Sequence, residues 1–324
     1  MMNCAVVGLG RWGRTLVEAA RSGGRLNLTR AVETDPARAR DFCAQHGLDL
    51  TTELDAVLND RTIDAVLLAT PHSLHLAQVI AAAAAGKQVF CEKPLALRRE
   101  HAARMFSACR DAGVALAVGH NRRFWPSMRA LRESVASGEL GTILHVEGHN
   151  SNENSQSVTE GWRLSPEEAP GGGLTGAGLH VLDGFVSLLG PVRQVYARLS
   201  SREAGPPPLD SAMLALDFQS GVTGMLATVR ATPFYWRVHV FGTRGSAEVL
   251  DEVTIVKRRS GNKPQRLTYP ALDAVAAELA AFADAVENKQ PFPVPEADVL
   301  ATLSAFEAAL QSMQTGHPVN CHGE

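Results

Sequence analysis

The sequence predicts a protein of mixed α/β and α+β class, in which residues 1–121 form a doubly wound parallel sheet and residues 122–324 form a domain with a mostly antiparallel sheet. Three observations lead to this prediction. Short apolar runs alternate with helical stretches as far as residue 121, which is typical of a parallel sheet covered by helices. A glycine-rich turn breaks the first apolar run, and later segments alternate apolar with polar residues, as antiparallel strands do. With 324 residues, 45% of them hydrophobic, the chain can bury the cores of two domains.

Composition argues against several classes of protein. The net charge of −3 gives no general attraction for nucleic acid. The run Ala81–Ala85 is too short to cross a bilayer, and the first residues lack the basic and apolar segments that direct export. Five scattered cysteines without CxxC spacing favour reduced thiols and a cytoplasmic protein. The pairs His72/His75 and His145/His149 lack cysteine or acidic company, so no metal site is expected.

The first apolar run and the turn after it carry the main functional signal. Four apolar residues, Cys4–Val7, lead into Gly8-Leu9-Gly10-Arg11-Trp12-Gly13, which has the dinucleotide-binding spacing at a junction from strand to helix. In that fingerprint the first glycine permits the tight turn, the second admits a pyrophosphate, and the third lets the helix pack on the strand. Unpaired N–H groups at the helix N-terminus would hold the phosphates. The alternative is a glycine turn in an unrelated βα unit.

An acidic residue follows at the distance that the fingerprint requires. Glu33 ends the second apolar run, Leu26–Val32, about 20 residues beyond the glycine turn. A carboxylate there accepts hydrogen bonds from the ribose hydroxyls and repels a 2′-phosphate, which favours NAD over NADP. Arg38, one turn into the next helix, could reach such a phosphate and leaves NADP open. The alternative for Glu33 is a solvated charge at a strand end.

The rest of the first half continues the alternation. Strands are expected at Leu26–Val32, Ala65–Leu68, Gln88–Cys91 and Ala115–Val118, and helices at Arg11–Arg21, Pro36–Gly47, Leu54–Leu58, Ser73–Ala85 and Leu97–Ala112. Ligands bind such sheets beyond the carboxyl ends of the strands. The residues that we expect to contact the cofactor there are Gly8, Leu9, Gly10, Arg11, Trp12, Gly13, Glu33, Arg38, Thr70, Pro71, His72, His75, Glu92 and Lys93. Taken singly, either histidine could simply cap a helix or pack.

Several motifs in order along the chain resemble one known family. They are Gly8–Gly13, Ala69-Thr70-Pro71, Glu92-Lys93-Pro94, Gly119–Phe124, Gly171–Gly173 followed by His180 and Asp183, Gly242–Gly245, and a C-terminal helix pair ending near Gly316-His317-Pro318. Together they resemble the Gfo/Idh/MocA family, named for glucose-fructose oxidoreductase and inositol dehydrogenase. The resemblance implies that Lys93 is catalytic and that Lys93–Pro94 is a cis peptide directing the amine toward the nicotinamide. It also implies a second domain with helices on one face of a large sheet, whose open face makes homodimer or homotetramer contacts.

The second half reads as strands enclosed by helices. Helices are expected at Pro126–Ser137, Leu174–Leu189, Ala271–Asn288 and Glu296–Thr315, and strands at Ile143–Gly148, Val192–Leu199, Ala212–Phe218, Val222–Arg230 and Arg237–Gly242. The polar stretch Asn150–Gln156 should be a surface loop. Trp162 and Arg163 follow it and could line a substrate, although Trp162 could equally cover the edge of the core. For Tyr235-Trp236 a place in the core or an interface is the safer expectation.

The glycine-rich helix near residue 180 holds the other candidate for catalysis. His180 and Asp183 stand three residues apart and share a helix face, and the resemblance makes His180 the base, with Asp183 to orient it. Sugar and polyol dehydrogenases of this family usually have an aspartate four residues before the histidine, where this chain has Gly176. Thr175, five residues before the histidine, should point elsewhere. The missing carboxylate puts inositol-type substrates in doubt and widens the pocket.

These features predict an NAD(P)-dependent oxidoreductase that moves a hydride between nicotinamide and a secondary alcohol or its ketone. The residues expected to bind substrate are Lys93, Asn121, Arg122, Trp162, Arg163 and His180. Lys93 and His180 should meet at the reactive ring, the lysine stabilising an alkoxide and the histidine taking its proton. The candidate substrates are a sugar, a cyclic polyol or a cis-dihydrodiol. Arg163 could pair bidentately with a carboxylate, which would suit a carboxylated diol. The alternative is a non-catalytic regulatory protein that binds a dinucleotide or sugar, which the glycine at position 176 suggests.

Overall fold

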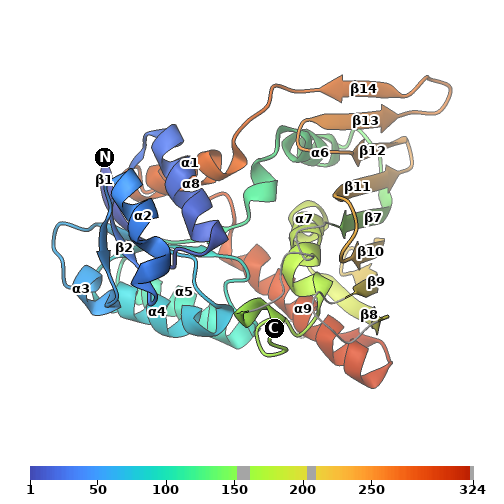
Figure 1. Ribbon diagram of the computed structural model, residues 1–324. Coiled ribbons are helices and arrows are strands. Elements are labelled where there is room, and N and C mark those ends of the chain that lie inside the picture. Colours follow the sequence, from blue (N-terminus) through green and yellow to red (C-terminus); the bar gives the residue numbers. More distant parts are fainter. Residues whose placement is uncertain (152–160, 203–208, 322–324) are drawn as a thin grey trace. The chain divides into compact units, whose positions relative to one another are not determined.

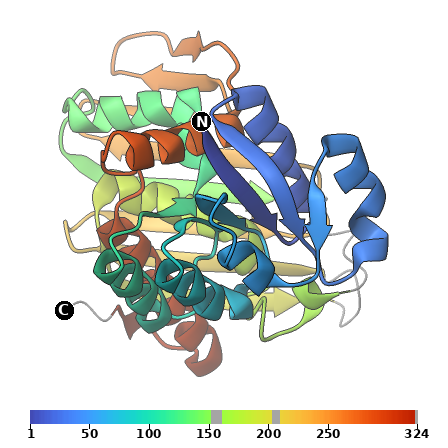
Figure 2. The same cartoon turned by 90° about the vertical axis from the view of Figure 1, so that its left-hand side faces the viewer.

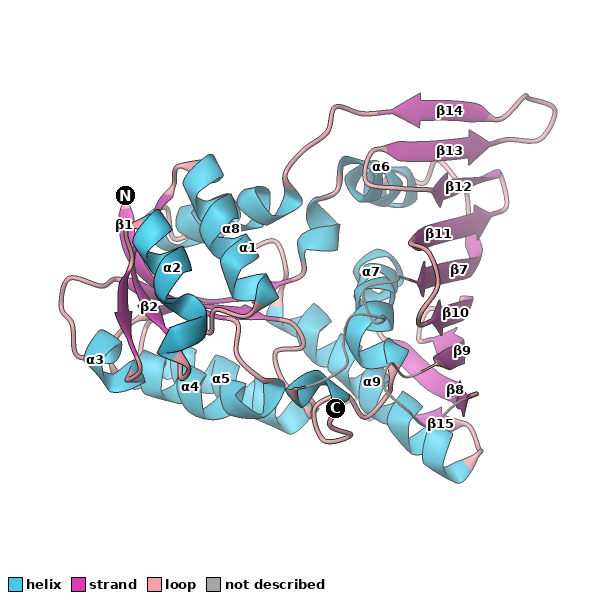
Figure 3. Ribbon diagram, viewed as in Figure 1, coloured by secondary structure: helices cyan, strands magenta, loops and turns pink. Residues whose placement is uncertain are grey.

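The computed structural model describes residues 1–151, 161–202 and 209–321. Its internal contacts divide the chain into two units. The first consists of Met1–Asn121 with Asp273–Glu296, and the second of Arg122–Leu272 with Ala297–Glu324. One contains a parallel sheet and the other a largely antiparallel sheet (Figure 3).

Six parallel strands form the sheet of the first unit, in the order β3-β2-β1-β4-β5-β6 (Figure 2). This is a doubly wound order, and it confirms the predicted parallel sheet. The strands are β1 (Met2–Val7), β2 (Leu26–Val32), β3 (Asp49–Thr51), β4 (Ala65–Leu68), β5 (Gln88–Glu92) and β6 (Leu116–Gly119). The sequence pattern does not reveal β3, because three residues are too few to show a period.

Helices cover both faces of this sheet, with α1 and α8 on one side and α4 and α5 on the other (Figure 1). They are α1 (Arg11–Gly23), α2 (Pro36–His46), α3 (Leu54–Leu58), α4 (His72–Ala84), α5 (Arg99–Asp111) and α8 (Ala274–Glu287). The predicted start of α2 is confirmed, since the Asp35 carboxylate accepts a hydrogen bond from the Ala37 N–H at 3.2 Å and Pro36 is the first helical residue.

Helix α8 completes the core of the first unit although it lies far along the chain. Leu279 and Phe282 belong to the same buried cluster as Leu16 and Phe90, and the rings of Phe90 and Phe282 lie 5.9 Å apart. We expected this helix to belong to the domain of residues 122–324, but its contacts group it with the first unit. The apolar face of α8 fits the exposed side of the parallel sheet beside α1, and a sequence pattern shows only that such a face needs a partner.

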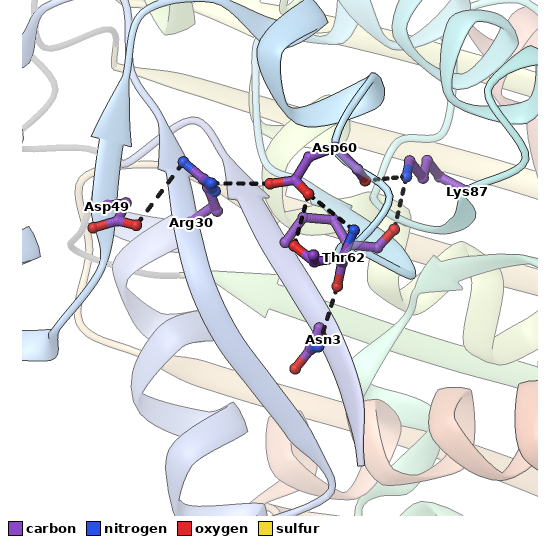
Figure 4. A network of polar contacts seen from close by, with 7 residues as sticks. Asn3, Arg30, Asp49, Asp60, Thr62 and Lys87 are labelled. Atoms are coloured by element: carbon purple, nitrogen blue, oxygen red, sulfur yellow. Dashed lines mark hydrogen bonds and ion pairs between the residues drawn. The ribbon is translucent and has the colours of Figure 1, made fainter.

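A polar network fixes the loop that enters β4 at the amino edge of the parallel sheet (Figure 4). The buried ammonium of Lys87 donates to the carbonyl oxygens of Asp60 and Ile63 at 2.6 and 2.7 Å. Asp60 also pairs with Arg30 at 2.9 Å and accepts from the N–H and hydroxyl of Thr62. Because these groups lie opposite the carboxyl edge, they stabilise the sheet without approaching the glycine turn.

The second unit has a nine-stranded sheet in the order β14-β13-β12-β11-β7-β10-β9-β8-β15. Only β7 and β10 pair in parallel among these described strands, so the prediction of a mostly antiparallel sheet is confirmed. The strands are β7 (Ile143–Ser151), β8 (Val192–Ser201), β9 (Asp210–Phe218), β10 (Thr223–Val229), β11 (Tyr235–Gly242), β12 (Gly245–Val249), β13 (Thr254–Arg258), β14 (Gln265–Thr268) and β15 (Val319–Asn320).

Strand β7 corrects the expected loop at Asn150–Gln156. Asn150 and Ser151 pair with Trp236 and Tyr235 of β11, so the strand continues through these two polar residues. Residues 152–156 lie outside the described residues. Polar composition misled the prediction because both side chains find hydrogen-bond partners within the fold: the Asn150 amide donates to the Ala177 carbonyl, and the Ser151 hydroxyl accepts from the Val229 N–H.

Helices α6 (Pro126–Ala136), α7 (Leu179–Leu189) and α9 (Glu296–Thr315) of the second unit lie on one face of its sheet (Figure 1). The short helical turns are η1 (Asn121–Phe124), η3 (Trp162–Leu164) and η4 (Leu174–Gly178). The opposite face has none among the described helices and carries exposed apolar side chains, including Met213 and Met225. This confirms the predicted arrangement of helices on one face only.

Candidate active site

The three glycines of the first turn occupy three different environments. Gly8 has φ +90°, and a Cβ there would stand 2.9 Å from the Ala69 carbonyl oxygen. A Cβ on Gly13 would overlap the carbonyl oxygen of Gly8, so the helix can approach the strand only without a side chain. A Cβ on Gly10 would meet no atom within 4 Å. The open space therefore lies over the second glycine, where the fingerprint places the pyrophosphate.

Helix α1 begins directly at this open space. Gly10 is its N-cap, and the described residues place neither a capping side chain nor an acidic residue at its first turn. The first N–H groups and the positive end of the helix dipole are thus available to an anion. Glu33 lies beside the turn, because its carboxylate accepts the Leu9 N–H at 2.8 Å. A cradle with an acid at the end of β2 fits a dinucleotide and its ribose.

Other residues of the expected cofactor set differ in what they can offer. Leu9 is buried at 3% exposure and therefore offers a ligand its backbone groups, whereas Trp12 is half-buried and packs against the core cluster. Arg11 and Arg38 are exposed, and the Arg38 carbonyl accepts a hydrogen bond from Arg14 at 2.6 Å. Because the Arg38 side chain is exposed in the first turn of α2, it could contact a phosphate bound at this edge of the sheet.

His75 links two of the loops that follow the strands. Its Nδ1 lies 3.1 and 3.2 Å from the carbonyl oxygens of Pro94 and Leu95, and its Nε2 lies 3.1 Å from the carbonyl oxygen of Thr70. The side chain is completely buried. The His75 ring therefore bridges the loops after β4 and β5, and its contact with the cofactor stays a prediction. His72, Pro71 and Thr70 remain half-buried at the same edge.

Lys93 follows β5 at the carboxyl edge of the same sheet. The predicted cis peptide between Lys93 and Pro94 is confirmed. The backbone N–H of Lys93 donates to the Glu92 carboxylate at 3.2 Å, and Glu92 is 6% exposed. Opposite it on β6, a Cβ on Gly119 would stand only 2.7 Å from the Glu92 carboxylate oxygen. The absence of a side chain at Gly119 thus leaves room for the Glu92 carboxylate beside Lys93. The sequence pattern did not indicate this role of Gly119.

The chain leaves the first unit through two of the expected substrate residues. Asn121 is 6% exposed, and its Oδ1 has no hydrogen-bond partner within the part of the chain that the structure describes. The Arg122 guanidinium lies 3.9 Å from the centre of the Trp125 ring and 5.5 Å from that of Trp236, and it pairs with Glu252 at 3.5 Å. Trp236 is 1% exposed, in agreement with the expected core position.

The predicted helix over residues 174–189 begins with a turn of π-helix. In η4 the N–H of Leu179 reaches the carbonyl of Leu174, five residues back, before α7 continues as a regular helix. The Thr175 hydroxyl is buried and accepts the Gly171 N–H at 3.0 Å, so it is engaged by the glycine-rich segment before the helix. A Cβ on Gly176 would meet no atom of the described residues within 4 Å. Turns of this type recur at functional sites.

Asp183, one turn beyond His180 on α7, forms a buried ion pair with Arg123. The guanidinium donates from Nε and Nη2 to the two carboxylate oxygens at 2.8 and 2.6 Å, and its Nη1 donates to Asp298 of α9 at 2.6 Å. The side chains of Arg123 and Asp183 are 2% and 1% exposed. Burial alone would lower the pKa of Arg123, but the two carboxylates raise it above its ordinary value.

This pairing adds a second contact to the interpretation of Asp183. Asp183 was expected to orient His180, and that role stays a prediction, while its carboxylate is also held in a bidentate pair by Arg123 of η1. Arg123 was not among the expected site residues, because its partners lie 60 and 175 residues further along the chain. The only signal in the sequence was the arginine pair that follows β6.

Trp162 and Arg163 lie together in η3. The Arg163 guanidinium is 4.2 Å from the centre of the Trp162 ring; Trp162 is half-buried and Arg163 exposed. Both thus remain at the surface, where a ligand could reach them. Within the described residues no group of three or more histidine, cysteine or acidic side chains could hold a metal ion. None of the helices described there is long and apolar enough to cross a membrane.

Comparison with known proteins matches both halves of the chain. Residues 2–120 match a model described as an oxidoreductase family with an NAD-binding Rossmann fold, and residues 128–248 match the GFO/IDH/MocA C-terminal domain. The chain is 30% identical to 1,5-anhydro-D-fructose reductase of Ensifer adhaerens over 297 residues, covering 88% of each protein. It is 29% identical to myo-inositol 2-dehydrogenase of Thermotoga maritima over 328 residues, 97% of this chain and 96% of that one.

A solved structure shows the same fold. Levoglucosan dehydrogenase in complex with NADH and levoglucosan is similar with a TM-score of 0.90 and 22% sequence identity, over 99% of this chain and 100% of that one. The resemblance that the motifs indicated is thereby confirmed. With both of its halves matched and its first sheet wound in the dinucleotide-binding order, the chain belongs to the GFO/IDH/MocA family of NAD-binding oxidoreductases.

Proposed function

We propose that this oxidoreductase uses Lys93 and His180 to interconvert a secondary alcohol and a ketone on a sugar or cyclic polyol. One observation carries the proposal: Lys93 follows β5 at the same edge of the parallel sheet at which the open glycine turn follows β1. A lysine at that edge lies on the side of the sheet where the cofactor binds. A cationic amine there is suited to an oxygen that gains negative charge.

In this proposal each residue has a defined task. Bound NAD supplies the hydride acceptor at the nicotinamide ring. Lys93 donates a hydrogen bond to the substrate oxygen and stabilises the charge that grows on it as the C–H bond breaks. His180 takes the hydroxyl proton during oxidation and returns it during reduction. The two protein groups together stabilise the oxygen at both stages, so loss of either should lower turnover more than substrate affinity.

Glu33 supports NAD as the preferred cofactor. Its carboxylate is already fixed beside the glycine turn by the Leu9 N–H, at the position where ribose hydroxyls need an acceptor. A 2′-phosphate would meet this negative charge. Exposed Arg38 is the residue that would compensate if NADP bound.

The substrate class rests on three supports. The relatives named above act on a polyol and an anhydro-sugar, according to their names. The space over Gly176 leaves room for a ring substituent where the family usually has a carboxylate. Asn121 and the exposed Arg163 offer polar groups for hydroxyls or a substrate carboxylate. Cyclic substrates with a free secondary hydroxyl are therefore the first to test.

We further propose that the protein works as a homodimer or homotetramer in the cytoplasm. The helix-free face of the nine-stranded sheet exposes Met213, Met225 and Tyr235 by 51%, 57% and 51% on three strands. Apolar side chains at this density favour contact with another copy. Free thiols at all five cysteines suit a reducing compartment. Light scattering after gel filtration tests the assembly, and Met225→Lys should weaken it.

A turnover assay tests the proposed reaction. Purified protein is incubated with NAD or NADP and a panel of sugars, cyclic polyols and cis-dihydrodiols, while the absorbance of the reduced cofactor is followed. Lys93→Met and His180→Gln should each lower kcat by about 100-fold or more, because each removes a group that acts in the transition state. NAD affinity, measured by fluorescence, should change little in His180→Gln and serves as the control for folding.

Two outcomes would contradict the proposal. Near-normal turnover by folded Lys93→Met would reject the lysine assignment. Tight binding of NAD with no turnover on any member of the panel would favour a regulatory protein that binds a dinucleotide or sugar.

A further inference from the structure

We propose that Arg123 is a positioning residue that compensates the charge of Asp183 and so sets the pH at which His180 exchanges its proton. This inference rests on the proposed role of His180 as the base. It assigns a function to a residue that lies within the Gly119–Phe124 motif but was not among the expected site residues. Arg123 acts through Asp183, one helical turn from His180 on α7.

The geometry of the ion pair supports a fixed rather than a fluctuating contact. Two parallel hydrogen bonds of 2.8 and 2.6 Å join the guanidinium to Asp183, and a third of 2.6 Å reaches Asp298. With both partners at least 98% buried, solvent can neither screen the pair nor replace one member. The three residues come from η1, α7 and α9, so the contact also fixes the helix that carries His180.

The electrostatic consequence follows from the spacing on α7. Residues three apart on a helix have Cβ atoms about 5–6 Å apart, within the range at which a charge shifts a titration. An uncompensated carboxylate at Asp183 would favour the protonated imidazole and block its use as a base. The bidentate guanidinium removes most of that field.

The charged groups that the described residues place near the pair include Arg129 and Arg132 of α6 and Asp298 of α9. Arg132 of α6 feels the charges of Arg123, Asp183, Asp298 and Arg129, and burial together with Arg123 lowers its pKa. Within this unit the cluster thus combines two carboxylates with two partly or fully buried arginines, while Arg129 is exposed. Removal of an arginine therefore leaves an excess negative charge, and removal of a carboxylate leaves an excess positive charge.

The test is an NMR titration of the His180 ring in the protein without cofactor. Its signal is assigned by its disappearance in His180→Gln. In Arg123→Met the carboxylate is uncompensated, and the midpoint should rise by about one pH unit. In Asp183→Asn the arginine is in excess, and the midpoint should fall. The double variant Arg123→Met/Asp183→Asn should return close to the wild-type midpoint.

Matched variants separate charge from structure. Arg123→Lys keeps the charge and should leave the midpoint near that of wild type even if it loosens the helix. Arg129→Met removes an exposed arginine from the neighbouring helix and should cause no shift. The double variant removes both members of the fully buried pair and leaves only the 28% exposed carboxylate of Asp298 without Arg123, so it remains informative if Arg123→Met fails to fold.

The outcomes distinguish this inference from the proposed function. Opposite shifts in the single variants that cancel in the double variant support it, and the acid limb of the pH profile of alcohol oxidation should then move with the midpoint. Shifts in the same direction, or single variants both within about 0.3 pH units of wild type, overturn it. If instead His180→Gln keeps turnover, the proposed base is wrong, whatever the titration shows.

Discussion

Substituting Gly13 or Gly10 by alanine should separate the folding role of the glycine turn from its binding role. A Cβ on Gly13 would overlap the Gly8 carbonyl oxygen, stand 3.0 Å from its carbon and lie 3.6 Å from the Ala69 side chain, so no direction is open for relief. Overpacking of this kind costs about 1–3 kcal/mol, and contact with rigid backbone puts Gly13→Ala near the upper end. The same change at Gly10 meets no atom of the described residues within 4 Å. Because alanine is a weaker N-cap than glycine, Gly10→Ala should lower the free energy of unfolding by about 1 kcal/mol or less.

Urea unfolding and NAD titration of the same two variants measure the two effects. Gly13→Ala should clearly lower the urea concentration at the midpoint of unfolding. It should also bind NAD more weakly, because less of the protein is folded. Gly10→Ala should have a urea midpoint close to that of the wild type. It should bind NAD at least about tenfold more weakly, because the added methyl group occupies the space in which the fingerprint places the pyrophosphate. Wild-type stability of Gly13→Ala, or wild-type affinity of Gly10→Ala, would refute the assignment of close packing to one glycine and phosphate approach to the other.

Three further predictions concern single side chains. Lys87→Met should lower the free energy of unfolding by about 1–3 kcal/mol in urea titrations, because the carbonyls of Asp60 and Ile63 lose a charged donor; an unchanged midpoint would contradict this. Burial lowers the pKa of His239 to about 4. Since the folded pKa lies below the unfolded value, stability should fall as pH drops from about 6.5 toward 4, by up to about 1.4 kcal/mol per pH unit. His239→Gln should reduce this acid sensitivity in calorimetry, and an identical pH dependence would exclude that histidine as its source. Glu33→Ala should weaken NAD by about tenfold and NADP less, as measured by fluorescence titration, whereas an equal loss for both would remove the carboxylate from cofactor selection.

Local signals in the sequence predicted most of the first unit. The glycine turn, the Asp35-Pro36 helix start and the apolar runs each depend on neighbouring residues, and the structure confirms all three. The Lys93–Pro94 cis peptide came from the family resemblance instead. Strand β3 was not predicted, because it has only three residues and none of them is buried.

Features that depend on distant parts of the chain were not predictable in the same way. The pattern of α8 shows an apolar face, but nothing in it reveals that the partner is the sheet of residues 1–121. Nothing in the neighbouring sequence predicts that Arg123 is buried, because its partners Asp183 and Asp298 lie far along the chain. The π-turn before α7 depends on how a glycine-rich segment packs, which periodicity does not encode. Strands β12–β14 escaped because they are short.

Helix α8 has a consequence for the order in which this protein is made. The buried cluster around Phe90 is closed by Phe282, so the first unit lacks part of its interior until almost the whole chain has left the ribosome. A nascent chain emerging at about 5–20 residues per second must keep that apolar surface unsatisfied for many seconds. Chaperones that bind exposed apolar segments would find a target there, and a fragment ending at Asn121 would aggregate for the same reason.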